Sequence, residues 1–224
     1  MASRQRVIAA DAAARAEVFN RVLEWTGPGC ASEEARERAM LLLLEAERHI
    51  DASRVALHMY IELLAGRLSP AACDPGGLME NVWWPLELSL VRSGIIGCVT
   101  ALDLCAAAFG RLAQPPIDEK EKRTPGQEWD VSSLNKKKDW IDSAFAGWLI
   151  DTRGDNAWAE LQWVRRGFAH RWVRRDVTIG AAKASVVSTG SNKKRPLDDL
   201  LRRSTDFSAK RVVVAWDALD VAAP

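Results

Sequence analysis

The chain has 224 residues, of which 48% are hydrophobic and 27% charged, and its formal net charge is +1. These values are ordinary for a soluble globular protein, and the length suits one domain over residues 1–224. No apolar run reaches 18 residues and the N-terminus has no long apolar segment, so neither a transmembrane span nor a signal peptide is expected. The four cysteines show no C-x-x-C spacing, which favours reduced thiols in a cytoplasm.

The charge is unevenly distributed along the chain. Residues 161–224 hold 13 Lys and Arg against 6 Asp and Glu, a balance of +7, whereas residues 1–160 have a balance of −6. This asymmetry favours an anionic partner bound locally by the C-terminal third.

Two helices are predicted in the first part of the chain. An amphipathic helix over residues 4–25 is ended by Gly27-Pro28-Gly29. A second helix starts at Ser32, where a capping hydroxyl precedes two acids, and runs to about Leu68.

The second predicted helix carries two stripes of side chains. Its core stripe is Leu43, Ile50, Leu57, Ile61 and Leu64. Its polar stripe is Glu47, Asp51, Arg54, His58 and Glu62. The polar stripe is either a solvated face with pairing between successive turns or, in part, a face turned toward another helix.

The most apolar predicted helix spans residues 86–112 and lies between two loops, residues 69–85 and 113–131. Its Gly94 and Gly97 would permit a neighbouring helix to approach closely.

A fourth helix is predicted from Ser132 or Ser133 to about Asp151. Its expected core face is Trp140, Ile141, Phe145, Trp148 and Leu149. Its lysine run, residues 136–138, is either a surface run or an indication of an anionic partner.

A basic and aromatic segment, residues 158–175, follows a tight turn at residues 153–156. Its apolar spacing predicts an amphipathic helix, with Asn156 as N-cap. Five arginines occur in it: Arg165, Arg166, Arg171, Arg174 and Arg175. Arg166 and His170 share a helical face, whereas Arg165 and His170 are about 140° apart at 3.6 residues per turn.

The remainder is expected to be less regular. Residues 176–200 form an irregular or β-containing appendage, with two short strands in V-T-I-G and S-V-V-S-T and a basic turn over residues 190–196. A short helix follows over 197–203. A last helix is capped within residues 204–206, with a strand at Val212–Val214 as the alternative. The fold class is therefore all-α, with about five main helices in an up-and-down bundle.

The string Arg165-Arg166-Gly167-Phe168-Ala169-His170 resembles the R-x4-6-H signature of HEPN domains. These are small all-helical domains of prokaryotic ribonuclease toxins and antiviral systems. The resemblance implies a HEPN-like bundle, a homodimer, an RNA substrate and an antitoxin or other protein partner. It also implies a polar residue on an earlier helix near the motif, for which Glu47 and Asp51 are the candidates. In many members an Asn follows the Arg, and Arg166 occupies that position here.

The resemblance implies a metal-independent endoribonuclease in which the 2′-hydroxyl of the RNA attacks the phosphate. His170 would be the acid/base, because imidazole titrates near neutrality. Arg165 would hold the phosphate, a role that Arg166 can share, because a guanidinium matches phosphate oxygens and stays charged. Arg171, Arg174 and Arg175 would bind neighbouring phosphates.

Two other interpretations remain. One is a non-catalytic HEPN-like module that binds a partner protein or a nucleotide, in which His170 is structural. The other is an unrelated helical bundle whose Arg165–His170 edge is an ordinary exposed face. No cofactor is expected, and the His and Cys spacing matches no metal-site or nucleotide-binding motif.

Overall fold

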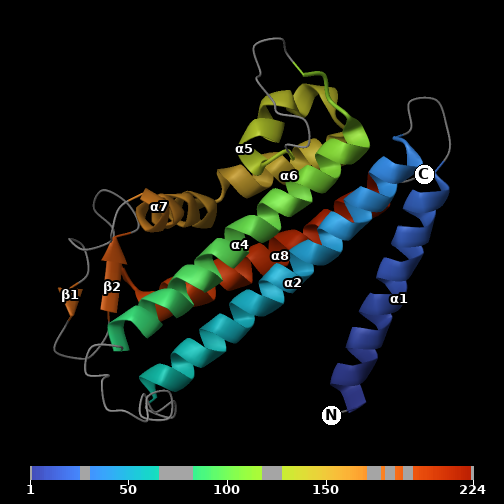
Figure 1. Cartoon of the computed structure of the whole chain (residues 1–224). Coiled ribbons are helices and arrows are strands. Elements are labelled where there is room, and N and C mark those ends of the chain that lie inside the picture. The colour runs from blue at the N-terminus through green and yellow to red at the C-terminus, as the bar shows by residue number, and fades with distance from the viewer. Residues whose placement is uncertain are drawn as a thin grey trace. The chain divides into compact units, whose positions relative to one another are not determined.

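A computed structural model gives the fold of the chain (Figure 1). It describes the backbone of residues 2–25, 31–65, 83–117, 128–170, 178–179, 185–188 and 194–222. Side chains are described for residues 12–25, 31–65, 86–117, 128–167 and 195–222.

Helices make up nearly all of the described chain, which confirms the all-α class. The elements in chain order are α1 (Ala2–Glu24), α2 (Glu33–Leu64), α4 (Trp83–Ala113), α5 (Val131–Leu134), the 3-10 helix η2 (Asn135–Trp140), α6 (Ser143–Gly154), α7 (Asn156–His170), β1 (Thr178–Ile179), β2 (Ser185–Ser188), β3 (Lys194–Pro196) and α8 (Leu197–Ala222).

The chain divides into two compact units. The first comprises residues 1–46, 102–153 and 211–224, and the second comprises residues 47–101 and 154–210. The helices α2, α4 and α8 each contribute residues to both units.

The start of α2 is capped as its sequence predicts. The Ser32 hydroxyl accepts a hydrogen bond from the backbone N–H of Ala35 at 3.2 Å, which satisfies one of the open donors of the first turn. The helix ends at Leu64, about four residues earlier than expected. On α1, Val18 and Val22 are buried, whereas Ala14, one turn before Val18, is exposed.

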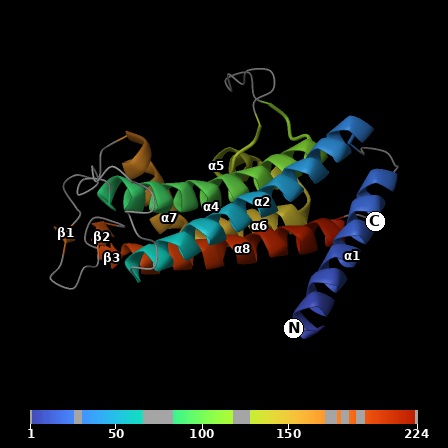
Figure 2. The ribbon, with the colours of Figure 1, turned by 60° about the horizontal axis from the view of Figure 1, so that its bottom comes forward.

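In the second unit, α2, α4 and α8 lie side by side (Figures 1 and 2). The two predicted close-approach glycines of α4 are confirmed. A Cβ on Gly97 would lie 2.5 Å from the Ser53 hydroxyl and 3.1 Å from the His49 carbonyl of α2, and one on Gly94 would overlap Leu201 of α8. The Ser53 hydroxyl lies in this contact. Two carbonyl oxygens are within hydrogen-bond distance of it as acceptors, His49 O at 2.8 Å and Gly94 O at 3.0 Å.

The core face of α2 was predicted correctly only in its first half. Leu43 and Ile50 are buried, but Leu57 and Ile61 are only half-buried and Leu64 is exposed. The buried positions beyond Ile50 are Ser53, Ala56, Tyr60 and Leu63. Two small or polar residues therefore take core positions that an apolar pattern does not mark.

Tyr60 and Glu87 form the main buried polar contact between α2 and α4. The phenol donates to Glu87 Oε1 at 2.7 Å, and both side chains are buried. Burial, and then the hydrogen bond to Glu87, raise the pKa of Tyr60 far above its usual 10.0. The phenol therefore stays protonated and keeps donating in the folded state.

In the first unit, an aromatic cluster packs α4 against α6. Phe109 and Phe145 stack with ring centroids 4.3 Å apart, and Trp148 meets Phe109 edge-on at 5.2 Å. Trp129 is buried beside Gly110, where a Cβ would overlap its indole. Arg111 donates two hydrogen bonds to Glu128, at 2.9 and 2.7 Å.

The single helix predicted over residues 132–151 is wrong. Asp130 forms a capping box with Ser133 and starts the short α5, which passes into η2, and α6 begins only at Ser143. Asp142 accepts from the N–H of Ala144 at 2.7 Å, so it caps a new helix start. Phe145, Trp148 and Leu149 are buried as predicted.

The same break changes the exposure of two predicted features. Trp140, expected in the core, is 68% exposed at the end of η2, and Ile141 is half-buried. Lys137 is buried, so the lysine run is not a continuous surface run, although Lys136 and Lys138 are exposed.

The C-terminal prediction of two helices with a break at residues 204–206 is also wrong, as is the strand alternative at Val212–Val214. The helix α8 runs continuously from Leu197 to Ala222. Ser204 and Thr205 are buried inside it, and Thr205 donates to the carbonyl of Leu201 at 2.8 Å instead of capping a new start.

A small antiparallel sheet precedes α8. The two predicted strands are confirmed as β1 and β2, and their order with β3 is β1-β2-β3. The third strand was predicted as part of a basic turn, but Arg195 pairs with Val187 and Pro196 with Val186. The prediction was wrong there because three residues are too few to show an alternating pattern.

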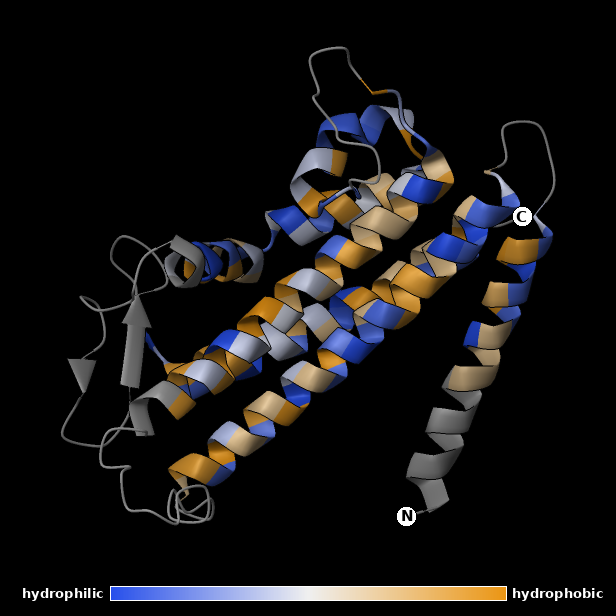
Figure 3. Cartoon of the chain, in the orientation of Figure 1, coloured by the Kyte–Doolittle hydropathy of each residue, from blue (hydrophilic) through white to orange (hydrophobic). Residues whose placement is uncertain are grey.

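The helix α4 contains the most apolar stretch of the described chain (Figure 3). Among the described residues, Leu86–Ala113 is the one helical span that is long and apolar enough to cross a membrane. In its most apolar 18-residue segment, 72% is buried inside the protein. Such burial is consistent with the core helix of a soluble protein.

Candidate functional site

The helix predicted to carry the Arg and His motif is confirmed as α7. It begins at Asn156 and ends at His170. The cap is Asp155 rather than Asn156: its carboxylate accepts from the N–H of Ala157 at 2.8 Å, and its carbonyl accepts from the N–H of Trp158 at 3.1 Å. The cap was misplaced by one residue because Asp and Asn have similar preferences for that position.

One face of α7 is fixed within the second unit. Trp158, Leu161 and Val164 are buried, and so is Glu160, an acid whose side chain is 9% exposed. Glu160 accepts from Nε and Nη2 of Arg195, both at 2.9 Å. The hydrogen bond to Glu160 raises the pKa of Arg195 above its ordinary value, so the guanidinium stays charged.

The opposite face of α7 is open to solvent. Trp163 is 47% exposed, and Ala159 and Arg166 are exposed as well. Arg165, four residues after the buried Leu161, is exposed on another side of the helix. The positions of Trp163, Arg166 and His170 are three and four residues apart, within about 60° of the helix circumference. They form a single stripe, which we call the α7 stripe.

Arg165 does not share this stripe. Its helical position is about 140° from that of His170, because five residues do not complete a whole number of turns. The structure therefore places Arg166, rather than Arg165, one turn before His170. The side chains of His170, Arg171, Arg174 and Arg175 lie outside the described residues.

The two acidic candidates of α2 differ in their surroundings. Asp51 is exposed, and its carboxylate pairs with Arg54 of the same helix at 3.0 Å. Glu47 is half-buried. Asp51, Arg54 and His58 are all exposed, as expected for a solvated face.

Two features of this region were missed from the sequence. The pairing of Glu160 with Arg195 joins residues 35 positions apart, and neither residue type is distinctive where it stands. Trp163 was noted as part of the basic segment but not assigned to the site. Its spacing of three residues from Arg166 is the signal that would have placed both on one face.

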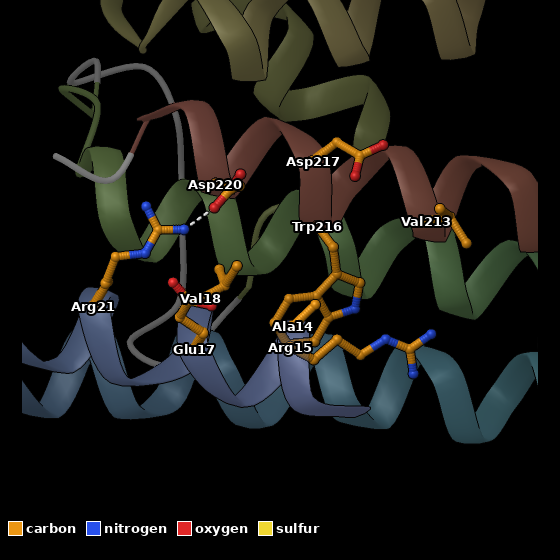
Figure 4. Close-up of a pocket in the computed structure, with 9 residues that line it drawn as sticks. All are labelled: Ala14, Arg15, Glu17, Val18, Arg21, Val213, Trp216, Asp217 and Asp220. Carbon is orange, nitrogen blue, oxygen red and sulfur yellow. Dashed lines mark hydrogen bonds and ion pairs between the residues drawn. The ribbon is translucent and has the colours of Figure 1, made fainter. Parts of the chain in front are cut away.

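A separate hollow of about 290 Å³ lies in the first unit, between α1 and the end of α8 (Figure 4). Its wall carries charges of both signs, including the ion pair between Arg21 and Asp220, and the buried Trp216 lies within it. It is lined by carboxylates and guanidiniums but by no His, Cys, Ser or Thr side chain, and it contains no residue of the Arg and His motif. The α7 stripe is the better candidate.

Comparison of the chain with protein-family models, with curated proteins and with solved structures gives no match. Among the side chains that the structure describes, no group of three His, Cys, Asp or Glu residues is arranged to hold a metal ion.

Proposed function

We propose that the protein is a HEPN-like, metal-independent endoribonuclease of a toxin or antiviral-defence type that acts in the cytoplasm. The observation that carries this proposal is the α7 stripe. An exposed indole and an exposed guanidinium precede His170 on one face of a helix whose other face is anchored in the core.

The stripe suits single-stranded RNA. An exposed indole stacks on a base of any identity, and a guanidinium forms paired hydrogen bonds with a phosphate. Trp163 and Arg166 offer these two groups one helical turn apart. The arginines at 171, 174 and 175 would extend the cationic track along the RNA backbone.

The proposed reaction is an internal transfer. His170 takes the proton from a 2′-hydroxyl, the 2′-oxygen attacks the adjacent phosphorus, and the bond to the 5′-oxygen breaks. The leaving oxygen receives a proton, so the products are a 2′,3′-cyclic phosphate and a 5′-hydroxyl. No external nucleophile or metal ion enters this balance.

The two arginines of the motif have different proposed roles. Arg166 is on the same face as His170, so it is the better placed to hold the scissile phosphate within one chain. Arg165 points from another part of the helix, where it would bind a phosphate further along the RNA. The assignment gives the main phosphate-binding role to Arg166, which occupies the position where many HEPN domains have Asn.

The test is cleavage of several RNA pools by the purified chain in the presence of EDTA. We expect His170→Ala to lower the cleavage rate at least about 100-fold, as for removal of a general acid or base. Arg166→Ala should lower it at least about 100-fold as well, as for removal of a group that stabilises charge in the transition state. Arg165→Ala should have a smaller effect. The matched control is Arg54→Ala, which removes an exposed arginine of α2 in the same unit. A folded wild type that binds RNA without cutting it would instead support a non-catalytic binding module.

A further inference from the structure

The hollow between α1 and the end of α8 has no part in the proposed ribonuclease reaction (Figure 4). Its volume of about 290 Å³ is near the lower end of the range for small-molecule sites. All of its lining residues belong to the first unit. Its wall therefore indicates, independently of the α7 stripe, which kind of molecule it suits.

The indole of Trp216 is the most informative group of the wall. The side chain is 6% exposed, and its Nε1 donor is buried without an acceptor in the described part of the chain. A buried indole N–H normally has a hydrogen-bond partner, because an unpaired donor loses its hydration without compensation. In Figure 4 the ring extends from α8 to α1, beside Ala14 and Arg15.

A second donor of the wall is in the same state. Arg21 pairs with Asp220 through Nη2, but its Nε is buried with no acceptor among the described residues. A carboxylate group carries acceptors only, so it is the ligand group that best suits a wall with unsatisfied N–H donors.

The acids of the hollow favour a cation in the same ligand. Glu17 of α1 and Asp217 of α8 are exposed, and neither has a hydrogen bond or ion pair within the described chain. In total the wall has three carboxylates and two guanidiniums, a balance of −1. A ligand with one carboxylate and two cationic groups has a net charge of +1 and balances this wall.

We propose that the hollow binds a free amino acid with a cationic side chain, such as arginine or lysine. The α-carboxylate of the ligand accepts from the indole N–H of Trp216, and its two cationic groups lie near Glu17 and Asp217. A diamine without a carboxylate would leave the indole unpaired. An acidic amino acid would be repelled by the two carboxylates.

The ligand reaches the indole only if α1 shifts, because Nε1 is covered in the structure. Residues 12–17 of α1 allow such a shift, since none of their side chains is buried, whereas Val18 and Val22 are. Segments with few buried contacts open most easily. A ligand that joins α1 to α8 should therefore slow hydrogen exchange of the α1 amides.

The test is isothermal titration calorimetry of the full chain with L-arginine and L-lysine. We expect dissociation constants on the order of 1 mM, as for other ligands of about this size. Agmatine, which is arginine without its carboxylate, should bind at least about 10-fold more weakly, because the indole donor stays unpaired. L-citrulline, which lacks the side-chain charge, should bind about 2- to 5-fold more weakly than L-arginine.

Variants test the two walls separately. Trp216→Phe keeps an aromatic ring but removes the donor, so it should weaken L-arginine binding about 10-fold and leave agmatine binding unchanged. Asp217→Asn should weaken L-arginine binding about 2- to 5-fold. Asp206→Asn is the matched control, because it removes an exposed carboxylate of the same helix outside the hollow. Circular dichroism establishes that each variant is folded.

An absence of binding by both amino acids up to about 20 mM would overturn the proposal. So would agmatine binding as tightly as L-arginine, or an equal loss in Asp217→Asn and Asp206→Asn. The comparison of agmatine with L-arginine uses the wild-type chain, so it decides the question even where a variant does not fold. RNA cleavage plays no part in these measurements, so either proposal can fail alone.

Discussion

The carboxylate of Glu160 in α7 accepts two hydrogen bonds of 2.9 Å each from the guanidinium of Arg195 in β3. Arg195 also lies 3.4 Å from Asp199 in the first turn of α8. This arrangement ties the helix of the candidate site to the strand and helix that follow it in the second unit. The exposed face of α7 is thereby held in a fixed orientation.

Removing the guanidinium should destabilise the fold. We expect Arg195→Ala to lower the free energy of unfolding by about 2 kcal/mol, less than the ~3–5 kcal/mol of a fully buried pair, because solvent reaches part of the arginine. Urea denaturation measures this. Arg54→Ala, which breaks an exposed pair with Asp51, should change stability by less than about 0.5 kcal/mol. Equal losses in the two variants would contradict the anchoring role of Glu160.

Adding one methyl group should have opposite effects in two helices. Gly97→Ala should cost about 1–3 kcal/mol, because its Cβ meets the His49 backbone carbonyl, which cannot move away easily. Gly147→Ala in α6 should stabilise the protein by roughly 0.5–1 kcal/mol, because nothing lies within 4 Å of the new Cβ. Thermal or urea unfolding of both variants checks the difference in sign.

Tyr60 should make stability depend on alkaline pH. Its folded-state pKa is raised, so above pH 10 the unfolded chain loses the phenolic proton while the folded chain retains it. The folded state then binds more protons, and the free energy of unfolding falls as pH rises above 10. Tyr60→Phe should lower the free energy of unfolding by about 1–2 kcal/mol at neutral pH, because Glu87 loses its hydrogen-bond donor. Above pH 10 the variant should lose less stability than the wild type, because it has no phenol at position 60 to titrate.

The chain offers a direct measurement of that titration, because Tyr60 is its single tyrosine. Ultraviolet absorbance of the phenolate should stay absent from the folded protein above pH 10 and develop only as the protein unfolds. Phenolate forming near pH 10 in folded protein would contradict the buried contact with Glu87.

RNA affinity should depend on the α7 stripe. Trp163→Ala should weaken binding by about 5- to 100-fold without changing its salt dependence, because stacking involves no counterion. Arg166→Ala should reduce the slope of log affinity against log salt by about one. Fluorescence anisotropy with a labelled RNA measures both. Trp140→Ala is the control, because Trp140 is 68% exposed in the other unit; an equal loss there would move the binding surface away from α7.

Several helices were predicted correctly from their apolar periodicity or from a cap. The helix α2 begins directly after Ser32, α7 covers residues 158–170 of the segment predicted as a helix over 158–175, and the two glycines of α4 allow the close approach expected of them. These features are local, so the residues concerned carry the signal themselves.

The errors arose where local signals competed. Ser204 and Thr205 resemble a helix cap, yet both are buried inside α8, because α8 packs against α4 there and Cys98 Sγ contacts the Thr205 hydroxyl at 3.8 Å. The break at Asp142 was missed because the aromatic residues on either side of it continue a helical pattern. Tertiary packing therefore explains why α8 continues through Ser204 and Thr205. The cap at Asp142 explains why α6 begins as a separate helix.

The candidate site was only partly predictable. The place of Arg166 on one face with His170 follows from their spacing, but the anchoring of α7 depends on Arg195, which is 35 residues from Glu160. A contact of that range leaves no pattern in a single sequence. The roles of Glu47 and Asp51 as supporting residues stay a prediction.

The central claim is that the RNA supplies its own nucleophile at the α7 stripe. The most direct measurement is mass spectrometry of the fragments that the wild-type protein releases in EDTA from an RNA carrying 2′-O-methyl groups at alternate nucleotides. We predict 2′,3′-cyclic phosphate and 5′-hydroxyl ends, with cleavage only after unmodified nucleotides. Fragments with 5′-phosphate ends, or cleavage after a 2′-O-methyl nucleotide, would show that water or another external nucleophile attacks the phosphate and would contradict the account.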